Sequence, residues 1–240
     1  MCTVGFVRIK EGFIVFKNRD LPPSHTVDNS LTFVSMPDTH FLAGVNIETT
    51  QSEGVSIGVN KHGVCVANTH AYSSSDITYD HLCGEILNHV RKAEDLAGTV
   101  EDYMRGKSLQ GGKILVVSRN WAYLVEVFKD KFAIKEQANY HAMTNHYELL
   151  PLVKKKIDRS SVIRRRNALD ALLNVEAAKD LKSLLRSHVP SKGKCSICVH
   201  GGEKSFTESS HIIEIVDNKI NWHYLTGNPC ENDYMVKTIF

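Results

Sequence analysis

The sequence predicts an α+β protein in which two antiparallel β-sheets form the core and helices pack outside them. Three observations lead to this class. Runs of β-branched and aromatic residues fill residues 2–72, a helical period follows, and strand and helix patterns then alternate toward the C-terminus. The 240 residues contain no repeat at a fixed period and no low-complexity linker, so we expect a single domain over residues 1–240.

Short strands joined by tight turns account for the N-terminal part. Lys10-Glu11-Gly12 separates two strand-like runs and predicts a hairpin, and a second hairpin is expected to turn at residues 60–63. The strands expected here are residues 2–9, 12–18, 32–37, 41–47 and the two arms within residues 54–72.

Helical periodicity occurs in the middle and late parts of the chain. Leu82, Ile86 and Val90 recur at helical spacing, and residues 99–105 continue this pattern after a capping threonine. Residues 160–188 are expected to be helical again, with leucines on the apolar faces. Strand patterns are expected again at residues 113–118 and 121–127, on either side of a turn at Arg119-Asn120, and at residues 127–136. A further hairpin is expected at residues 210–225.

Composition narrows the classes of function. Hydrophobic residues make up 42% and charged residues 23% of the chain, and the net charge is only +2. These values are typical of a globular protein and indicate neither nucleic acid nor a membrane surface as a partner. No apolar stretch is long enough to span a membrane, no signal peptide is evident, and six scattered cysteines suit a reducing compartment, so a cytoplasmic protein is expected. A homo-oligomer is compatible with this sequence.

Cys2 follows the initiator methionine directly. If Met1 is removed, one residue carries both a thiol and an α-amine, whose reference pKa values are about 8.5 and about 7.7–8.0. The neutral amine can then accept the thiol proton, which makes a nucleophile and its base from a single residue. The alternative for these two letters alone is a small apolar residue at the start of a strand.

The predicted first hairpin brings a second motif beside Cys2. Antiparallel pairing returns residues 17–20 (KNRD) to the start of the chain. Arg19 and Asp20 are therefore candidates to hold the terminal amine and to stabilise a thiolate. An ordinary ion pair at a strand end is the alternative.

Six motifs in order resemble those of one enzyme family. They are MCT…VFKNRD, GVNKHGVCVANTHAY, AMTNHYELLP, SSVIRRRNALDALL, SICVH and TGNPCENDYMVKTI, and they extend from residue 2 to residue 239. The chain thus resembles the N-terminal-nucleophile cysteine hydrolases that include choloylglycine hydrolases, penicillin V acylases and penicillin acyltransferases. The resemblance implies a four-layer αββα fold, with two antiparallel sheets between helical layers and the nucleophile on the first inner strand.

The resemblance also implies roles for individual residues. Cys2 matches the nucleophile, and Asp20 matches the carboxylate that bonds its amine. Asn68 matches the oxyanion-hole asparagine, Asn145 the second active-site asparagine, and Arg164 the late arginine near the thiol. The early arginine departs from the pattern, because Arg19 directly precedes Asp20 and Asn18 occupies the alternative position.

Loops that follow the Asp20 and Asn68 motifs are expected to flank the substrate. They comprise residues 21–30 and 69–80, and Tyr72 and Tyr79 are the candidate substrate-binding side chains, with loop anchoring as the alternative. The chain is short for a bile salt hydrolase, which disfavours bile salts as substrates.

Cys195 and Cys198, with His200 close behind, suggest a metal or redox site. Zinc needs a second pair of ligands, and Cys230 and His211 lack matching close spacing, so no metal is assigned. A redox motif of this kind usually opens a helix after a strand, which this strand-rich segment does not show. The resemblance instead makes SICVH a core strand that ends near the site.

We therefore expect an amidohydrolase that cleaves the linear N-acyl bond of a small-molecule amide through a thioester on Cys2, without cofactor. Acyl transfer to an amine is an alternative outcome of the same chemistry. A second hypothesis is a non-catalytic protein resembling the NRDE-motif Golgi-organisation family, which also begins MC, although Leu21 replaces the glutamate of that motif. A glutaminase domain is a third, disfavoured by Thr3 where glycine is expected.

Overall fold

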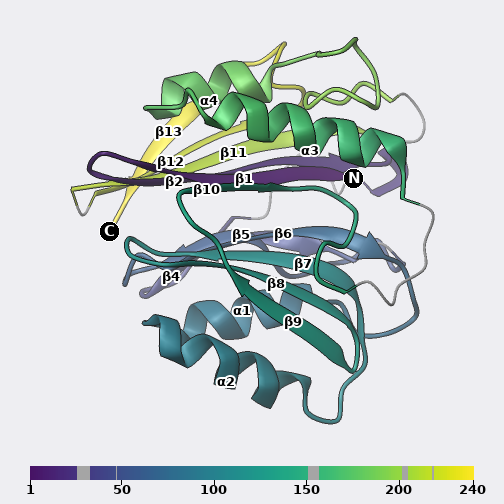
Figure 1. The fold of residues 1–240 in the computed structure, drawn as a ribbon, viewed down its shortest axis with the longest axis vertical. Helices are drawn as coiled ribbons and strands as arrows, with labels where there is room; N and C mark the ends of the chain where they lie inside the picture. The colour runs from purple at the N-terminus through teal and green to yellow at the C-terminus, as the bar shows by residue number, and fades with distance from the viewer. Residues whose placement is uncertain (26–32, 47, 151–156, 202–204, 218) are drawn as a thin grey trace. The chain divides into compact units, whose positions relative to one another are not determined.

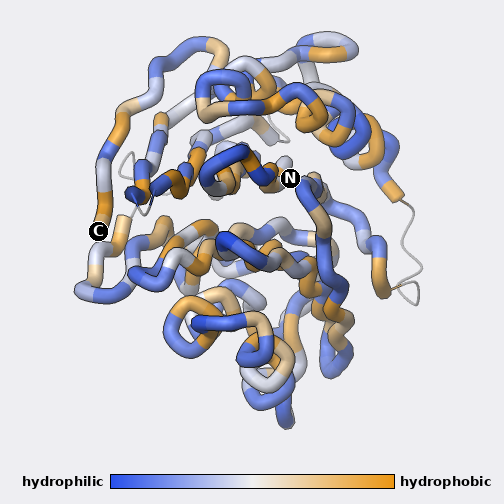
Figure 2. The backbone as a smooth tube through the Cα atoms, turned by 60° about the vertical axis from the view of Figure 1, so that its left-hand side comes forward, coloured by the Kyte–Doolittle hydropathy of each residue, from blue (hydrophilic) through white to orange (hydrophobic). Residues whose placement is uncertain are grey.

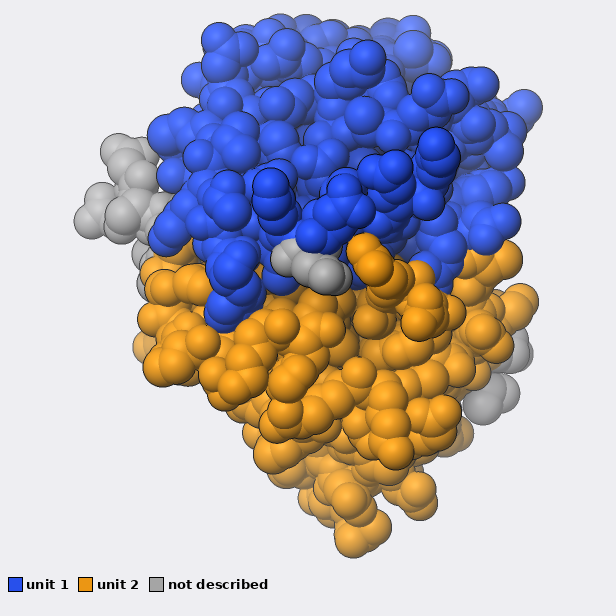
Figure 3. Space-filling model, turned by 90° about the vertical axis from the view of Figure 1, so that its left-hand side faces the viewer, with its two compact units in different colours: residues 1–29, 139–146, 155–240 blue, residues 30–138, 147–154 orange. Residues whose placement is uncertain are grey.

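The computed structural model describes residues 1–25, 33–46, 48–150, 157–201, 205–217 and 219–240. The chain forms two compact units, which Figure 3 distinguishes by colour. Unit 1 comprises residues 1–29, 139–146 and 155–240, and unit 2 comprises residues 30–138 and 147–154. Each unit has one antiparallel sheet and two α-helices, which confirms the predicted α+β class.

Unit 1 is built on a six-stranded sheet. Helices α3 (Arg159–Leu172) and α4 (Ala178–Leu185) cover one face of it (Figure 1). Alternate residues of the first two strands, such as Val7 and Phe16, pack against these helices. The strand order is β10 (Tyr140–Met143), β1 (Cys2–Ile9), β2 (Gly12–Leu21), β11 (Phe206–Val216), β12 (Lys219–Thr226) and β13 (Met235–Ile239), with a short 3-10 helix, η1 (Pro23–His25), after β2.

Unit 2 has a seven-stranded sheet. Helices α1 (Asp80–His89) and α2 (Ala93–Met104) pack on one face, where Leu82, Ile86 and Leu96 meet strand residues such as Val66. The strand order is β3 (Phe33–Ser35), β4 (Thr39–Val45), β5 (Ser52–Asn60), β6 (Cys65–Tyr72), β7 (Leu109–Val117), β8 (Ala122–Lys129) and β9 (Lys131–Glu136).

The helices pack on the sheets because their sequences are amphipathic. Figure 2 shows hydrophilic and hydrophobic stretches alternating along their turns. Such a helix buries its apolar stripe against a sheet and exposes the other side. Within the described residues, no helix is long and apolar enough to cross a membrane.

The structure differs from the predicted elements at several boundaries. The helical stretch 160–188 is two helices, separated at residues 173–177. Strands β10 and β13 were not predicted, because short edge strands depend on a partner more than on their own composition. Strand β2 continues through Leu21, so Arg19 and Asp20 lie inside a strand rather than after it. Residues 32 and 47 of two predicted strands, and much of loop 21–30, lie outside the described residues.

Candidate active site

Strand register brings Cys2 and Arg19 together on unit 1. They are direct partners across β1 and β2, so their side chains project from the same face of the sheet. This face is opposite the one that α3 and α4 cover, because Thr3 and Asn18, the neighbouring pair, alternate to the helical side. Gly12 makes this hairpin compatible with β11, since any Cβ there would collide with the Ile215 carbonyl.

The backbone of Cys2 is held by polar side chains from two other segments. Asn145, two residues after the end of β10, accepts a hydrogen bond from Cys2 N at 3.0 Å. Arg164 Nη1 donates to Cys2 O at 2.8 Å and to Thr3 Oγ1 at 3.0 Å. The same guanidinium donates through Nη2 to Asn145 Oδ1 at 3.0 Å. Arg164 thus fixes the asparagine that receives the Cys2 nitrogen.

Asp20 belongs to the same cluster and lies on the helical face of the sheet, beside Arg164. Its carboxylate is fully buried, accepts from Thr207 Oγ1 at 2.7 Å, and lies 3.6 Å from Arg164 Nη1. Burial raises the pKa of Asp20 to about 6, although the positive charge of Arg164 opposes the shift. Burial also lowers the pKa of Arg164, against the attraction of Asp20.

Met1 occupies the end of the hairpin in this structure. Its amino group donates to the Asp20 carbonyl at 2.8 Å, and the Asp20 N–H donates to the Met1 carbonyl at 2.9 Å. These two bonds continue the antiparallel ladder by one residue beyond Cys2. Without Met1, the nitrogen of Cys2 would be an amine with Asn145 Oδ1 as its acceptor.

Asn18 and Arg19, the two residues compared with the early arginine of the family, point to opposite faces of the sheet. Asn18 donates to the carbonyls of Leu185 and Ile197 and accepts from Ser210 Oγ, all on the helical side. Arg19 shares the face of Cys2 and forms a buried ion pair with Glu208, with Nε and Oε2 2.7 Å apart. Arg19 is therefore the direct cross-strand neighbour of Cys2 on this face, with its charge paired by Glu208.

Sequence reasoning missed several residues of this cluster. Lys17 and His211 are cross-strand partners, buried on the Cys2 face. Burial, aided by Arg19 and Lys17, holds the pKa of His211 well below its ordinary value. Strand alternation pointed to Lys17, two residues before Arg19. Thr207 and Glu208 gave no signal, because the irregularity between Thr207 and Ser209 depends on pairing with β2.

Asn68 lies in unit 2, and its amide is engaged there. Its Nδ2 donates to Val55 O at 2.7 Å and to Asp80 Oδ1 at 2.8 Å, with Cys83 Sγ at 3.4 Å. These partners place the side chain on the face of the sheet that carries α1. A primary amide has two hydrogens, and these two oxygen acceptors account for both. The oxyanion role expected for Asn68 stays a prediction.

Tyr72 and Tyr79 also belong to unit 2. Tyr79 is buried in the core between the sheet and α1, stacked so closely over Gly112 that a Cβ there would collide with its ring. Tyr72 makes an edge contact with Phe128, with ring centroids 5.0 Å apart. Their proposed role in substrate binding likewise stays a prediction.

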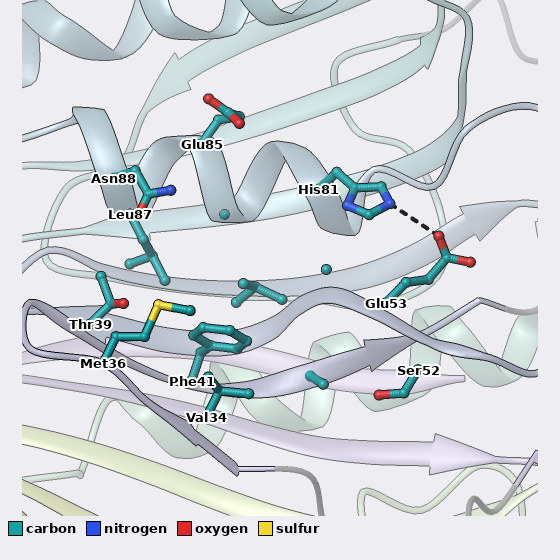
Figure 4. A pocket seen from close by; sticks show the side chains of 14 residues that line it. Val34, Met36, Thr39, Phe41, Ser52, Glu53, His81, Glu85, Leu87 and Asn88 are labelled. Carbon is teal, nitrogen blue, oxygen red and sulfur yellow. Dashed lines mark hydrogen bonds and ion pairs between the residues drawn. The ribbon is translucent and has the colours of Figure 1, made fainter.

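A cavity of about 500 Å³ opens in unit 2 between α1 and strands β3–β5. In Figure 4, His81 points toward Glu53, and the two side chains are 3.0 Å apart. The other lining side chains are mainly apolar, including Val34, Phe41 and Leu87. Ser52 also lines the cavity, but its hydroxyl donates to Gly44 O at 3.4 Å, so we assign no chemistry to this cavity.

Comparison with solved structures shows a shared fold. The C2A mutant of conjugated bile acid hydrolase from Clostridium perfringens matches with a TM-score of 0.61 at 11% identity, over 100% of this chain and 92% of its own. Penicillin V acylase from Agrobacterium tumefaciens matches with a TM-score of 0.60 at 10% identity, over 100% and 86%. An N-acylethanolamine-hydrolyzing acid amidase orthologue from Caenorhabditis elegans matches with a TM-score of 0.52 at 14% identity, over 90% and 92%.

No protein-family model and no curated protein sequence matches this chain. The likeness is therefore one of structure, and at these identities it establishes the fold. The predicted N-terminal-nucleophile hydrolase fold is confirmed.

Proposed function

We propose that the chain is an amidohydrolase that cleaves a linear N-acyl amide through a thioester on Cys2, after removal of Met1. The observation that carries this proposal is the set of buried polar groups around the backbone of one residue. Asn145, Arg164 and Asp20 all surround Cys2, and an ordinary strand residue needs no such arrangement. The fold shared with solved acylases supports the same class of reaction.

The reaction follows from the two functional groups of Cys2. The amine takes the proton of the thiol as sulfur attacks the amide carbon, and it then delivers this proton to the leaving nitrogen as the C–N bond breaks. Asn145 Oδ1 orients the amine, and Arg164 holds both Asn145 and the Cys2 carbonyl in place, with Arg19 across the strand from Cys2. Water then attacks the thioester, with the amine again as base, and releases the acid. A free amine in place of water would give acyl transfer.

Removal of Met1 also creates a place for the substrate. The N–H and carbonyl of Asp20, which bond Met1 in this structure, would lose these partners beside the new amine. One donor and one acceptor side by side are the complement of a single amide group. We infer that the scissile N-acyl amide pairs with them in the position that Met1 holds.

Trapping the thioester tests this proposal. Processed protein, whose start at Cys2 is verified by intact mass, is incubated with N-acyl amino acids, penicillin V and conjugated bile acids and then denatured. An acyl adduct on Cys2 is expected with at least one substrate. Cys2→Ala should fold and show neither adduct nor turnover, whereas Cys65→Ala, which removes a cysteine of unit 2, should retain the adduct.

Two outcomes would contradict the nucleophile. One is full activity in protein that retains Met1, and the other is turnover by Cys2→Ala at the original rate. Processed protein that binds a ligand from this panel without turning it over would favour the non-catalytic alternative.

A further inference from the structure

Four potential metal ligands lie close together in unit 1, and none of them has a role in the proposed reaction. His188, Cys198, His200 and Cys230 each offer a nitrogen or sulfur atom, and these four atoms all lie within 4.8 Å of one another. Sequence spacing pointed to Cys195 and Cys198 with His200 close behind, and no metal was assigned to them. The structure brings Cys198 and His200 together and leaves Cys195 outside the cluster. Cys230, considered but set aside, does join them, His211 does not, and His188 was hidden at the end of a predicted helix.

The distances match a tetrahedral zinc site. Cys198 Sγ lies 3.5 Å from Cys230 Sγ and 3.4 Å from His200 Nε2, and His200 Nε2 lies 3.3 Å from Cys230 Sγ. Ligands about 2.3 Å (sulfur) and about 2.0–2.1 Å (nitrogen) from zinc at tetrahedral angles are roughly 3.3–3.8 Å apart. Two sulfurs and two imidazoles are also the donor set that selects zinc over magnesium or calcium.

The contacts around the four residues are those expected of metal ligands before the metal binds. His188 Nε2 is buried and has no hydrogen-bond partner among the described residues, which is costly unless another group satisfies it. The His188 and His200 rings lie edge to face, with centroids 5.0 Å apart. Asn228 Nδ2 lies 3.6 Å from Cys198 Sγ while it donates to Val199 O, as a group that supports a thiolate would.

We propose that His188, Cys198, His200 and Cys230 bind one structural zinc ion. The ligands come from three stretches outside the long strands and helices: the exit of α4, the segment before β11, and the turn between β12 and β13. Such segments bury little apolar surface of their own, so a metal that joins them contributes directly to folding. Four protein ligands leave no open coordination position, which makes the site structural rather than catalytic.

The zinc site has a direct connection to the Cys2 cluster. Val199, between two of the ligands, donates from its N–H to Thr207 Oγ1 at 2.8 Å, and this hydroxyl donates to Asp20 Oδ1. Ile197 O receives Asn18 Nδ2 on the same strand β2. The metal therefore positions the segment that orients Asp20, without contact with the reacting atoms.

Metal content tests the site without reference to activity. Tag-free, reduced protein from zinc-supplemented cells is expected to contain one zinc per chain by elemental mass spectrometry. Cys198→Ser and Cys230→Ser should contain less than about a tenth of this amount. Cys195→Ser, in the same motif but outside the cluster, and His89→Gln, at an exposed position of α1, should retain it. Equal zinc in all variants, or none in reduced wild type, would overturn the proposal.

Cobalt substitution keeps the test decisive if the serine variants fail to fold. Wild-type protein stripped of zinc and loaded with Co²⁺ should show the intense visible bands of a tetrahedral site and a thiolate charge-transfer band. An octahedral spectrum would contradict the proposal, as would a Cys198–Cys230 disulfide in protein whose reduced form takes up neither metal. Chelation should lower the Tm of wild type by roughly 5–15 °C and leave that of folded Cys198→Ser unchanged.

Discussion

Each unit buries a cluster of charged side chains, and the two clusters are satisfied to different degrees. In unit 2, Glu126 accepts three backbone N–H groups, from residues 148, 149 and 150, at 2.7–3.0 Å. Lys113 Nζ lies 3.6 Å from Glu126 and 2.5 Å from Glu148. In unit 1, neither Asp20 Oδ2 nor Arg164 Nε has a hydrogen-bond partner among the described residues.

This difference separates a structural cluster from a reactive one. A buried carboxylate with several amide donors anchors a loop and has little left to offer a ligand. A buried carboxylate with an open oxygen, and with its pKa raised to about 6, is poised to change protonation near neutral pH. The comparison predicts that variants of the unit 1 cluster change both rate and stability, whereas variants of the unit 2 cluster change stability alone.

The largest effect is expected from Arg164→Ala. This change leaves Asp20 buried without its cation and removes the donors to Cys2 O and Asn145, so the free energy of unfolding should fall by about 3–5 kcal/mol. Arg164→Lys keeps the charge but cannot bond all its present partners, and it should recover stability more than rate. Denaturant unfolding and kcat on the two variants measure this; a normal rate in folded Arg164→Ala would remove Arg164 from the site.

Asp20→Asn should change the response to pH. The native pKa of about 6 lies above the reference value of 3.8, so the native state binds the proton more tightly than the unfolded chain. The wild type therefore loses stability as pH rises from about 4 to about 6, by about 3 kcal/mol in all. The amide of the variant mimics the neutral acid, so the variant should be the more stable protein above pH 6, and the difference should vanish below pH 4.

The rate should respond in the opposite direction. If ionised Asp20 supports the Cys2 amine, the rate of wild type falls as pH drops through about 6, and Asp20→Asn should be slower by about 10²-fold or more with this acid limb absent. Unfolding and rate profiles are compared in protein whose processing is verified by mass. An unaltered acid limb in the variant would assign that ionisation to another group.

Glu126→Gln tests the other side of the comparison. Gln keeps the shape but loses the charge beside Lys113 and an acceptor for backbone N–H groups, so stability should fall by about 1–3 kcal/mol. The kcat of the folded variant should stay within about twofold of wild type. A rate loss as large as that of Asp20→Asn would show that the unit 2 cluster also serves the reaction.

Asn68→Ala tests the one predicted catalytic residue that lies in unit 2. Loss of its bonds to Val55 O and Asp80 Oδ1 should lower stability by about 1–3 kcal/mol, and an unchanged kcat in the folded variant would contradict the oxyanion role. A fall of about 10²–10³-fold in kcat with normal stability and substrate affinity would instead support the oxyanion role.

The sequence by itself determined the local pattern and the central residue of this protein. The β-branched and aromatic run at residues 2–9 and the helical spacing of Leu82, Ile86 and Val90 are encoded in adjacent residues. A strand buried on both faces is a continuous apolar run, whereas a helix buried on one face repeats its apolar residues every three or four positions. The MC start, the NRD motif and the order of later motifs singled out Cys2, Asp20, Asn145 and Arg164, which unit 1 brings together.

Tertiary structure decided which neighbours these residues have. Register across β1 and β2 placed Arg19 rather than Asn18 beside Cys2, since a shift of one residue would exchange the two faces. Glu126 binds the backbone of a loop more than twenty residues later in the chain. Cys230 contacts Cys198 although strands β11 and β12 separate them in the sequence. Such contacts depend on how distant segments pack, and no local period records them.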